Sequence, residues 1–183
     1  MVTAAGGEGI AVAVDQADDE QTKALFTQIG SDHGRIEILV NIAATIRDEM
    51  MGPTKFWQEP INVIDILDVG LRSSYVATVF AAPLMISQHK GLVASTSASG
   101  AAHYMFGPAY GVAKAGTDKM AADMAVVAAD PAKFGHVLDS AETPELTGHI
   151  IWEVYNDPDP MELSGRTLVG AELAAKYGIA DER

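Results

Sequence analysis

The sequence predicts an α/β fold in which a parallel sheet packs against helices. Three short apolar runs, residues 9–15, 36–41 and 91–97, have the composition of buried strands. Each is followed by a stretch in which apolar residues recur at helical spacing, over residues 18–30, 62–87 and 110–128. Strands and helices that alternate in this way form parallel neighbours joined by right-handed crossovers. We therefore expect one domain over residues 1–183, with its ligand site at the carboxyl ends of the strands.

Local signals support each of these helices. Asp18 is followed three residues later by Gln21, the pattern of a capping box, and Gly30 is placed to end the first helix. Pro83 lies inside the second helix and predicts a bend there. The third helix is rich in alanine and glycine, which allow another helix to approach closely.

The pattern weakens after Pro131. Residues 134–138 make a poor strand, residues 145–155 can form a helix, and residues 164–169 resemble a short final strand. We find no internal repeat and no linker.

Composition excludes several classes of function. The net charge is −13, from 25 acidic and 12 basic residues, so the clustered positive charge that nucleic acids require is missing. The absence of cysteine excludes disulfides, thiolate nucleophiles and zinc–thiolate sites, and favours a reducing compartment. The amino terminus lacks the pattern of a signal peptide, and the apolar stretch at residues 75–86 is short for a membrane span. We expect a cytoplasmic protein without a membrane or nucleic-acid partner.

Ser97, Tyr110 and Lys114 form the strongest chemical pattern in the sequence. Tyr110 and Lys114 stand four residues apart in the third helix, so their side chains emerge on one face. Ser97 ends the strand that precedes this helix, at the sheet edge where α/β proteins bind ligands. Chance placement of an ordinary aromatic and an exposed charge is the alternative.

These residue types suit hydride transfer between a carbon atom and a nicotinamide ring. Such a reaction moves a proton to or from the neighbouring oxygen, and a tyrosine hydroxyl can carry that proton. Tyrosine normally titrates near pH 10, about three units too high for a base at neutrality, so a nearby ammonium is needed to favour the phenolate. Lys114 would meet that need, and Ser97 would hydrogen-bond the substrate oxygen.

The segments TSASG at residues 96–100 and YGVAK at residues 110–114 resemble the serine strand and YxxxK helix of the short-chain dehydrogenase/reductase family. Residues 101–125 and 163–179 look closest to its dehydrogenase/reductase member-one-like subgroup. The resemblance covers nearly the whole chain. It implies a Rossmann-like three-layer fold and NAD(P)-dependent oxidation or reduction of a small carbonyl or alcohol.

The same resemblance implies roles for further residues. Asp15 matches the acidic residue that contacts adenine, and Asn41 and Ala43 fall within a match to the family's NNAG segment. Asp68 occupies the place of the asparagine in the catalytic helix, and Lys114, beside Tyr110, would also bind the nicotinamide ribose. The cofactor would be NAD or NADP, and the two long helices would pair subunits in a homodimer or homotetramer.

The sequence also departs from the family. The first strand, the glycine-rich TGxxxGxG turn, the first helix and the second strand of the fold have no match, so we expect an incomplete Rossmann-like sheet. The glycines at residues 6–9 precede a strand, whereas a phosphate-binding turn follows one. Ile42 and Ala44 replace the second asparagine and the glycine of NNAG, and the Pro-Gly segment is absent at residues 137–141. An inactive remnant or partial gene product that acts through helix association is therefore the alternative.

Other candidates for chemistry are weaker. The five histidines have no paired metal spacing, so we expect no metal site, and no GxSxG elbow is present. Trp57, near Phe56, and the aromatic residues Tyr104 and Phe106 fit either a substrate pocket or ordinary packing, and the sequence leaves both open.

Overall fold

The computed structural model describes residues 2–129, 144–163 and 168–180. The chain divides into two compact units, Met1–Ala129 and Asp130–Arg183, each of which is described separately below. The prediction of one domain over residues 1–183 stays a prediction.

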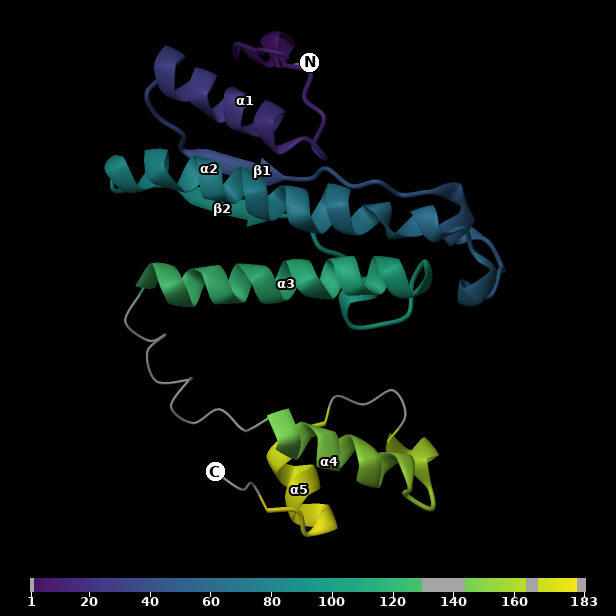
Figure 1. Ribbon diagram of the computed structural model, residues 1–183. Coiled ribbons are helices and arrows are strands. Elements are labelled where there is room, and N and C mark those ends of the chain that lie inside the picture. Colours follow the sequence, from purple (N-terminus) through teal and green to yellow (C-terminus); the bar gives the residue numbers. More distant parts are fainter. Residues whose placement is uncertain (1, 130–143, 164–167, 181–183) are drawn as a thin grey trace. The chain divides into compact units, whose positions relative to one another are not determined.

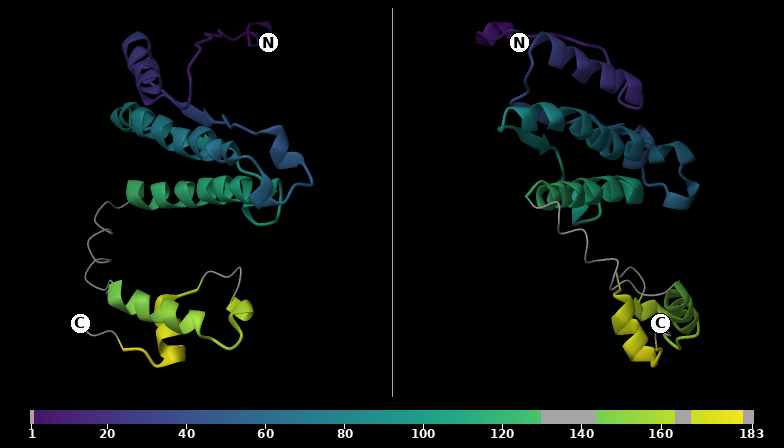
Figure 2. Two further views of the ribbon diagram at one scale, coloured as in Figure 1. Left: turned by 45° about the vertical axis from the view of Figure 1, so that its right-hand side comes forward. Right: turned by 60° about the vertical axis from the view of Figure 1, so that its left-hand side comes forward.

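The first unit contains three helices and two strands in the order α1, β1, α2, β2, α3 (Figure 1). Their bounds are α1 Asp19–Asp32, β1 Ile38–Asn41, α2 Ser73–Ser87, β2 Leu92–Ser95 and α3 Gly107–Ala129. Figure 2 shows α1, α2 and α3 lying one beside the next, with the two strands next to α2. All three predicted helices are therefore present, with ends that differ from the prediction by a few residues at most, apart from the start of α2.

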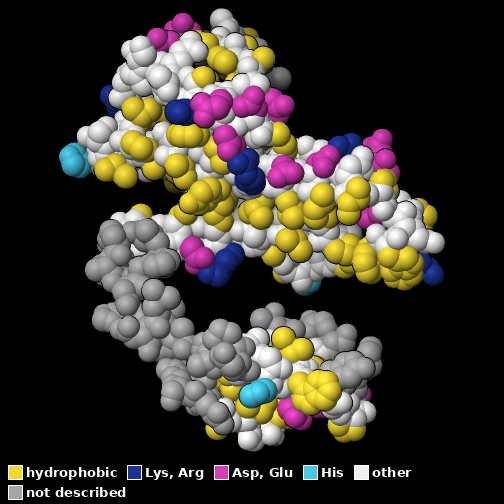
Figure 3. Space-filling view, in the orientation of Figure 1, with side chains coloured by type: hydrophobic (Ala, Val, Ile, Leu, Met, Phe, Trp, Pro, Cys, Tyr) yellow, Lys and Arg dark blue, Asp and Glu magenta, His cyan; other side chains and the backbone are white. Residues whose placement is uncertain are grey.

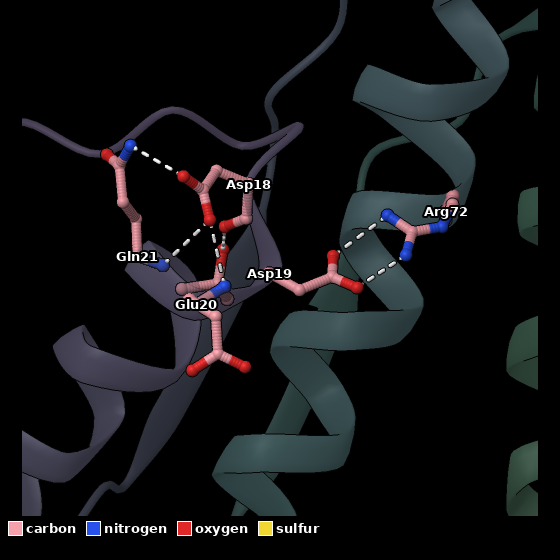
Figure 4. A network of polar contacts seen from close by, with 6 residues as sticks. Asp18, Asp19, Glu20, Gln21 and Arg72 are labelled. Carbon is pink, nitrogen blue, oxygen red and sulfur yellow. Dashed lines mark hydrogen bonds and ion pairs between the residues drawn. The ribbon is translucent and has the colours of Figure 1, made fainter.

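The predicted cap at Asp18 is confirmed, but the reciprocal bond of a capping box is not formed, because the Asp18 backbone N–H donates to the Asp15 carbonyl and not to Gln21. The Asp18 carboxylate accepts hydrogen bonds from the backbone N–H groups of Glu20 and Gln21, and the Gln21 amide donates to it as well (Figure 4). Hydrogen bonds from the Gln21 backbone and side chain lower the pKa of Asp18. These bonds satisfy N–H groups that have no partner inside the helix, which fixes where α1 begins.

A bidentate ion pair joins α1 to the residue that precedes α2. The Arg72 guanidinium donates to both carboxylate oxygens of Asp19, and one of these bonds measures 2.8 Å (Figure 4). The hydrogen bond from Arg72 lowers the pKa of Asp19 and raises that of Arg72. Below this pair, Phe26 of α1 packs with Ala77 and Ala81 of α2 in a buried cluster.

β1 and β2 form a parallel pair in which Asn41 lies opposite Ser95. One face of the pair packs against α2, and the other presents Ile38, Val40 and Leu92, each more than half exposed. Parallel sheets are usually covered on both faces. Of the three layers predicted, the described residues thus form two, the sheet and the helices on one side.

The predicted strand at residues 9–15 is wrong. This run has no regular secondary structure, is mostly exposed, and pairs with no strand in the described part of the chain. Its apolar composition is typical of a strand, but a strand also needs a neighbour for its backbone hydrogen bonds.

The predicted helix over residues 62–87 is interrupted. A π-helical turn at Leu67–Arg72 contains non-helical backbone at Val69 and Gly70, where the Gly70 φ is 149°. The freed Val69 carbonyl accepts a hydrogen bond of 2.8 Å from the Thr45 backbone N–H. α2 then continues through Pro83, so the interruption lies ahead of α2, more than ten residues before the predicted bend.

Among the described residues, Ile61–Ser87 is long and apolar enough to cross a membrane by length and composition alone. This segment is longer than the apolar stretch at residues 75–86 noted from the sequence. One such helix is weak support for a span, because the core helix of a soluble protein passes the same test.

The second unit contains α4, Pro144–Tyr155, and α5, Gly170–Tyr177, packed through Leu146, Ile150 and Ala174. α4 agrees with the predicted helix, whereas α5 was not predicted. The predicted strand at 134–138 lies outside the described residues, as does most of the one at 164–169. Residues 168 and 169 of that second run are described, and neither is in a strand.

Candidate active site

Three of the four predicted catalytic residues, Ser97, Tyr110 and Lys114, lie close together where β2 leads into α3. β2 ends at Ser95, a short helical turn at Ser99–Ala101 follows, and α3 begins at Gly107. The first two turns of α3 therefore bring Tyr110 and Lys114 back beside the end of the strand, as the spacing of these residues predicts.

Lys114 links the three residues. Its Nζ atom lies 5.6 Å from the centroid of the Tyr110 ring and donates a hydrogen bond of 3.3 Å to the Thr96 carbonyl. The Ser97 hydroxyl donates a long bond of 3.5 Å to the Lys114 carbonyl. Ser97 and Tyr110 thus each contact Lys114, and the ammonium is held on the face of α3 that carries the tyrosine.

The ring of Tyr110 is buried. It lies in a cluster with Met50, Ile66 and Ala113, and the Phe106 ring packs on it edge-to-face at 5.1 Å. Gly100 lies against the same ring, so closely that a Cβ atom there would stand 2.6 Å from the ring carbon Cε1. The ring is therefore enclosed by packing.

The Tyr110 hydroxyl, by contrast, reaches solvent. No buried side-chain oxygen or nitrogen lacks a hydrogen-bond partner in the described part of the chain, and the Tyr110 hydroxyl makes no hydrogen bond there. The oxygen is consequently accessible. A fixed ring with an accessible hydroxyl suits a group that exchanges a proton with a bound substrate.

Asp68 stands apart from these three residues. It lies in the π-helical turn, its carboxylate is exposed, and none of its described contacts reaches Ser97, Tyr110 or Lys114. Its negative charge acts on Arg72, whose pKa it helps to raise after the larger effect of Asp19. A catalytic role for Asp68 stays a prediction.

Asn41 serves the fold. Its side chain is buried, and the amide nitrogen lies 3.4 Å from the Ser74 carbonyl, 3.3 Å from the Thr78 hydroxyl and 3.4 Å from the Ser95 hydroxyl. These contacts tie β1 to α2 and β2. A contact between Asn41 and a cofactor stays a prediction.

The other two predicted cofactor residues are exposed. The Asp15 carboxylate accepts a hydrogen bond of 2.9 Å from the Ala17 backbone N–H, which forms a tight turn before α1. Ala43 follows β1 with an accessible surface. Within the described residues, no group of three or more acidic or histidine side chains could hold a metal ion.

Residues 1–131 match the profile of the short chain dehydrogenase family. The chain belongs to this family. The match covers more than half of the chain, including both strands and all of α1 to α3.

Curated relatives agree with this assignment. Dehydrogenase/reductase SDR family member 1 of Homo sapiens is 32% identical over 212 residues, covering 96% of this chain and 68% of the relative. Its counterpart in Mus musculus is 31% identical with the same coverage. The predicted likeness to the member-one-like subgroup is therefore confirmed.

Solved structures share the fold. A metagenomic short-chain oxidoreductase in complex with NADP superposes with a TM-score of 0.60 at 28% identity, covering 68% of this chain and 55% of that one. A short-chain dehydrogenase/reductase from Burkholderia xenovorans gives 0.61 at 24% identity, covering 70% and 48%. The fold is thus an incomplete Rossmann-like α/β fold, as predicted, and the match spans about half of each solved chain.

Two parts of the site were not identified from the sequence. Gly100 lies inside the TSASG segment, but its contact with Tyr110 depends on how the loop folds back. Met50 comes from a turn at Asp48–Met51 that carries no chemical signal. For Phe106 and Tyr104, the sequence left open whether the side chains line a substrate pocket or pack within the fold. Phe106 packs on Tyr110, whereas Tyr104 is 89% exposed.

Proposed function

We propose that this chain is an NAD(P)-dependent oxidoreductase that interconverts a small carbonyl compound and its alcohol. The observation that carries the proposal is the enclosed Tyr110 ring, with an accessible hydroxyl, beside the Lys114 ammonium. Membership in the short-chain dehydrogenase family supports the same reaction class.

Each of the three side chains has a role in this reaction. The Tyr110 hydroxyl gives a proton to the carbonyl oxygen during reduction, and the Tyr110 phenolate takes the proton from the alcohol during oxidation. The positive charge of Lys114 stabilises the phenolate that remains on Tyr110. The Ser97 hydroxyl turns from the Lys114 carbonyl to donate a hydrogen bond to the substrate oxygen.

The residues present fit one end of the cofactor. The half-buried Lys114 ammonium has three donors and makes one described hydrogen bond, so it can also bind a ribose hydroxyl next to the nicotinamide. When bound, the nicotinamide supplies or accepts the hydride. The exposed Asp15 would lie toward adenine, while the glycine-rich turn that cradles the pyrophosphate has no match in the sequence.

The alternative is a chain without turnover that acts through association of α2 and α3. The carboxylate of Asp68 favours this alternative, because it cannot donate the hydrogen bond of the asparagine that the family places there. Both functions are compatible with a homodimer or homotetramer formed through the two long helices, and we include that assembly in the proposal.

Binding of NADH and NADPH provides the first test. Saturable binding at micromolar nucleotide, measured by nucleotide fluorescence together with the melting temperature, supports the oxidoreductase. The nucleotide that binds more tightly identifies the cofactor. Absence of binding up to millimolar concentrations would favour the chain without turnover.

Replacement of Tyr110 tests the mechanism. Tyr110→Phe removes the proton carrier and keeps the buried ring, so we expect turnover to fall at least a hundredfold with little change in stability. Tyr104→Phe is the matched control, since Tyr104 is 89% exposed. Undiminished carbonyl reduction by Tyr110→Phe would refute the role of this hydroxyl.

A further inference from the structure

Phe106 has an unusual backbone conformation immediately before α3. Its φ is 54°, in the left-handed region that large side chains rarely adopt, and Gly107 follows with a φ of 86°. Among the described residues, His89 is the other non-glycine residue with a positive φ. A bulky residue is kept in this conformation only where its surroundings compensate for the strain.

The contact between Phe106 and Tyr110 provides that compensation. The two ring centroids are 5.1 Å apart and the ring planes are 86° apart, an edge-to-face arrangement that is favourable between aromatic rings. Phe106 itself remains 36% exposed, so it is not simply a core residue. The left-handed turn aims its ring at Tyr110.

Phe106 adds a contact that the rest of the cluster does not supply. Met50, Ile66 and Ala113 pack around the Tyr110 ring, and Gly100 lies against its Cε1 and Cδ1 atoms. Phe106 comes from the segment that directly precedes α3, close to Glu59, whose carboxylate is 3.8 Å from where a Cβ atom of Gly107 would lie.

We propose that Phe106 is a positioning residue for Tyr110. Through its strained turn it limits rotation of the phenol ring and holds the hydroxyl toward the surface shared with Ser97 and Lys114. The catalytic consequence rests on the proposed oxidoreductase function, whereas the effect on the Tyr110 ring does not.

Four variants separate positioning from packing. Phe106→Ala and Phe106→Gly both remove the ring, but glycine also relieves the left-handed strain. Phe106→Tyr keeps the ring. Tyr104→Ala is the control for loss of a neighbouring exposed aromatic side chain.

The first readout is the Tyr110 ring signal in NMR spectra of protein labelled with ¹³C-tyrosine, assigned with Tyr110→Phe. Loss of the ring current of Phe106 should shift this signal in the alanine and glycine variants. It should stay near its wild-type position in Phe106→Tyr and Tyr104→Ala. An unmoved Tyr110 signal in Phe106→Ala overturns the proposal, whatever the activity.

The second readout is catalysis. We expect kcat to fall about three- to tenfold in Phe106→Ala and Phe106→Gly, the factor that one aromatic pair can supply. In these two variants KM should change little, and the pH dependence of kcat should shift. In Phe106→Tyr, both kcat and its pH dependence should stay close to those of the wild type. Phe106→Gly should keep a higher melting temperature than Phe106→Ala, so that a fall in kcat in both variants cannot be assigned to unfolding.

The outcomes distinguish this proposal from the proposed function. If the wild-type chain has no activity with either nucleotide but the Tyr110 signal shifts as expected, the oxidoreductase function fails and the positioning contact stands. If the wild type is active and kcat is unchanged in Phe106→Ala, the positioning role is overturned and the function stands.

Discussion

The enclosure of Tyr110 depends on a residue without a side chain. Gly100 stands where a methyl group would lie 2.6 Å from Cε1 and 2.8 Å from Cδ1 of the Tyr110 ring. The ring is buried among other side chains and cannot move aside freely.

We therefore predict that Gly100→Ala destabilises the protein by about 1–3 kcal/mol, the usual cost of overpacking a core. Urea denaturation measures this change in the free energy of unfolding. Gly148→Ala is the control, because an added Cβ there meets no atom within 4 Å. Equal stability of Gly100→Ala and the wild type would contradict the close contact.

At the residue scale, the sequence predicts which residues carry the chemistry better than it predicts which residues pack around them. The four-residue spacing of Tyr110 and Lys114 is enough to place them on one helix face, because helix geometry is regular. The contacts of Gly100 and Phe106 with Tyr110 depend on the path of the loop between β2 and α3, which no local pattern determines. Asn41 is similar: its match to the family segment indicated a cofactor role, and its contacts join β1, α2 and β2.

At the scale of elements, predictions succeed where the signals are local. The cap at Asp18 and the apolar spacing of α1 lie within one segment, and the helix forms as expected. Residues 9–15 carry an equally plausible strand pattern, but a strand depends on a partner elsewhere in the chain. The break at Val69 and Gly70 depends on a distant donor too, the Thr45 N–H. α5 is short, and eight residues give little periodicity.

Exposed apolar residues on both long helices support the proposal that these helices associate. On α2 they are Tyr75, Val79 and Ile86, and on α3 they include Val112, which is 56% exposed. Figure 3 shows hydrophobic side chains gathered over α2 on the visible face. Apolar surface of this kind is typical of an interface between subunits.

We predict that Val79→Glu and Val112→Glu each weaken subunit association about tenfold or more, because a charge would be buried without a partner. Light scattering coupled to size-exclusion chromatography measures the mass across a dilution series. Ile10→Glu, at a site that is 64% exposed and does not belong to either helix, is the control. A mass that stays the same in all three variants at every concentration would place the interface elsewhere.

At the scale of the whole molecule, the chain consists of two units with separate cores. The first is centred on the Tyr110 cluster and the packing of α1 on α2, and the second on Leu146, Ile150 and Ala174. The sequence indicated a weaker pattern after Pro131 but not a second core. Each core arises from contacts between residues distant in sequence, which local periodicity does not report.

The second unit has its own polar contact between the turn after α4 and the end of α5. The Asp157 carboxylate accepts hydrogen bonds from the Tyr177 hydroxyl at 2.5 Å and the Lys176 ammonium at 3.0 Å. The hydrogen bond from Tyr177 has the largest effect on the pKa of Asp157, followed by the bonds from the Asp159 backbone N–H and from Lys176. Together these bonds lower that pKa to about 2. The Asp157 side chain is only 10% exposed.

We predict that this contact makes the second unit sensitive to acid. Because the pKa of Asp157 is lower in the folded chain than its ordinary value of 3.8, the stabilisation is complete above that value and is lost as the pH falls toward 2. Asp157→Asn should therefore unfold more easily at neutral pH, and its stability should depend less on pH between about 4 and 2 than that of the wild type.

Trp57 and Trp152 are the two tryptophans of the chain, so in a Trp57→Phe background fluorescence reports on α4 alone. Acid titration of that protein, with and without Asp157→Asn, measures the difference directly. Identical acid transitions would show that Asp157 does not hold α5 in place, and the packing of Leu146, Ile150 and Ala174 would then account for the stability of this unit.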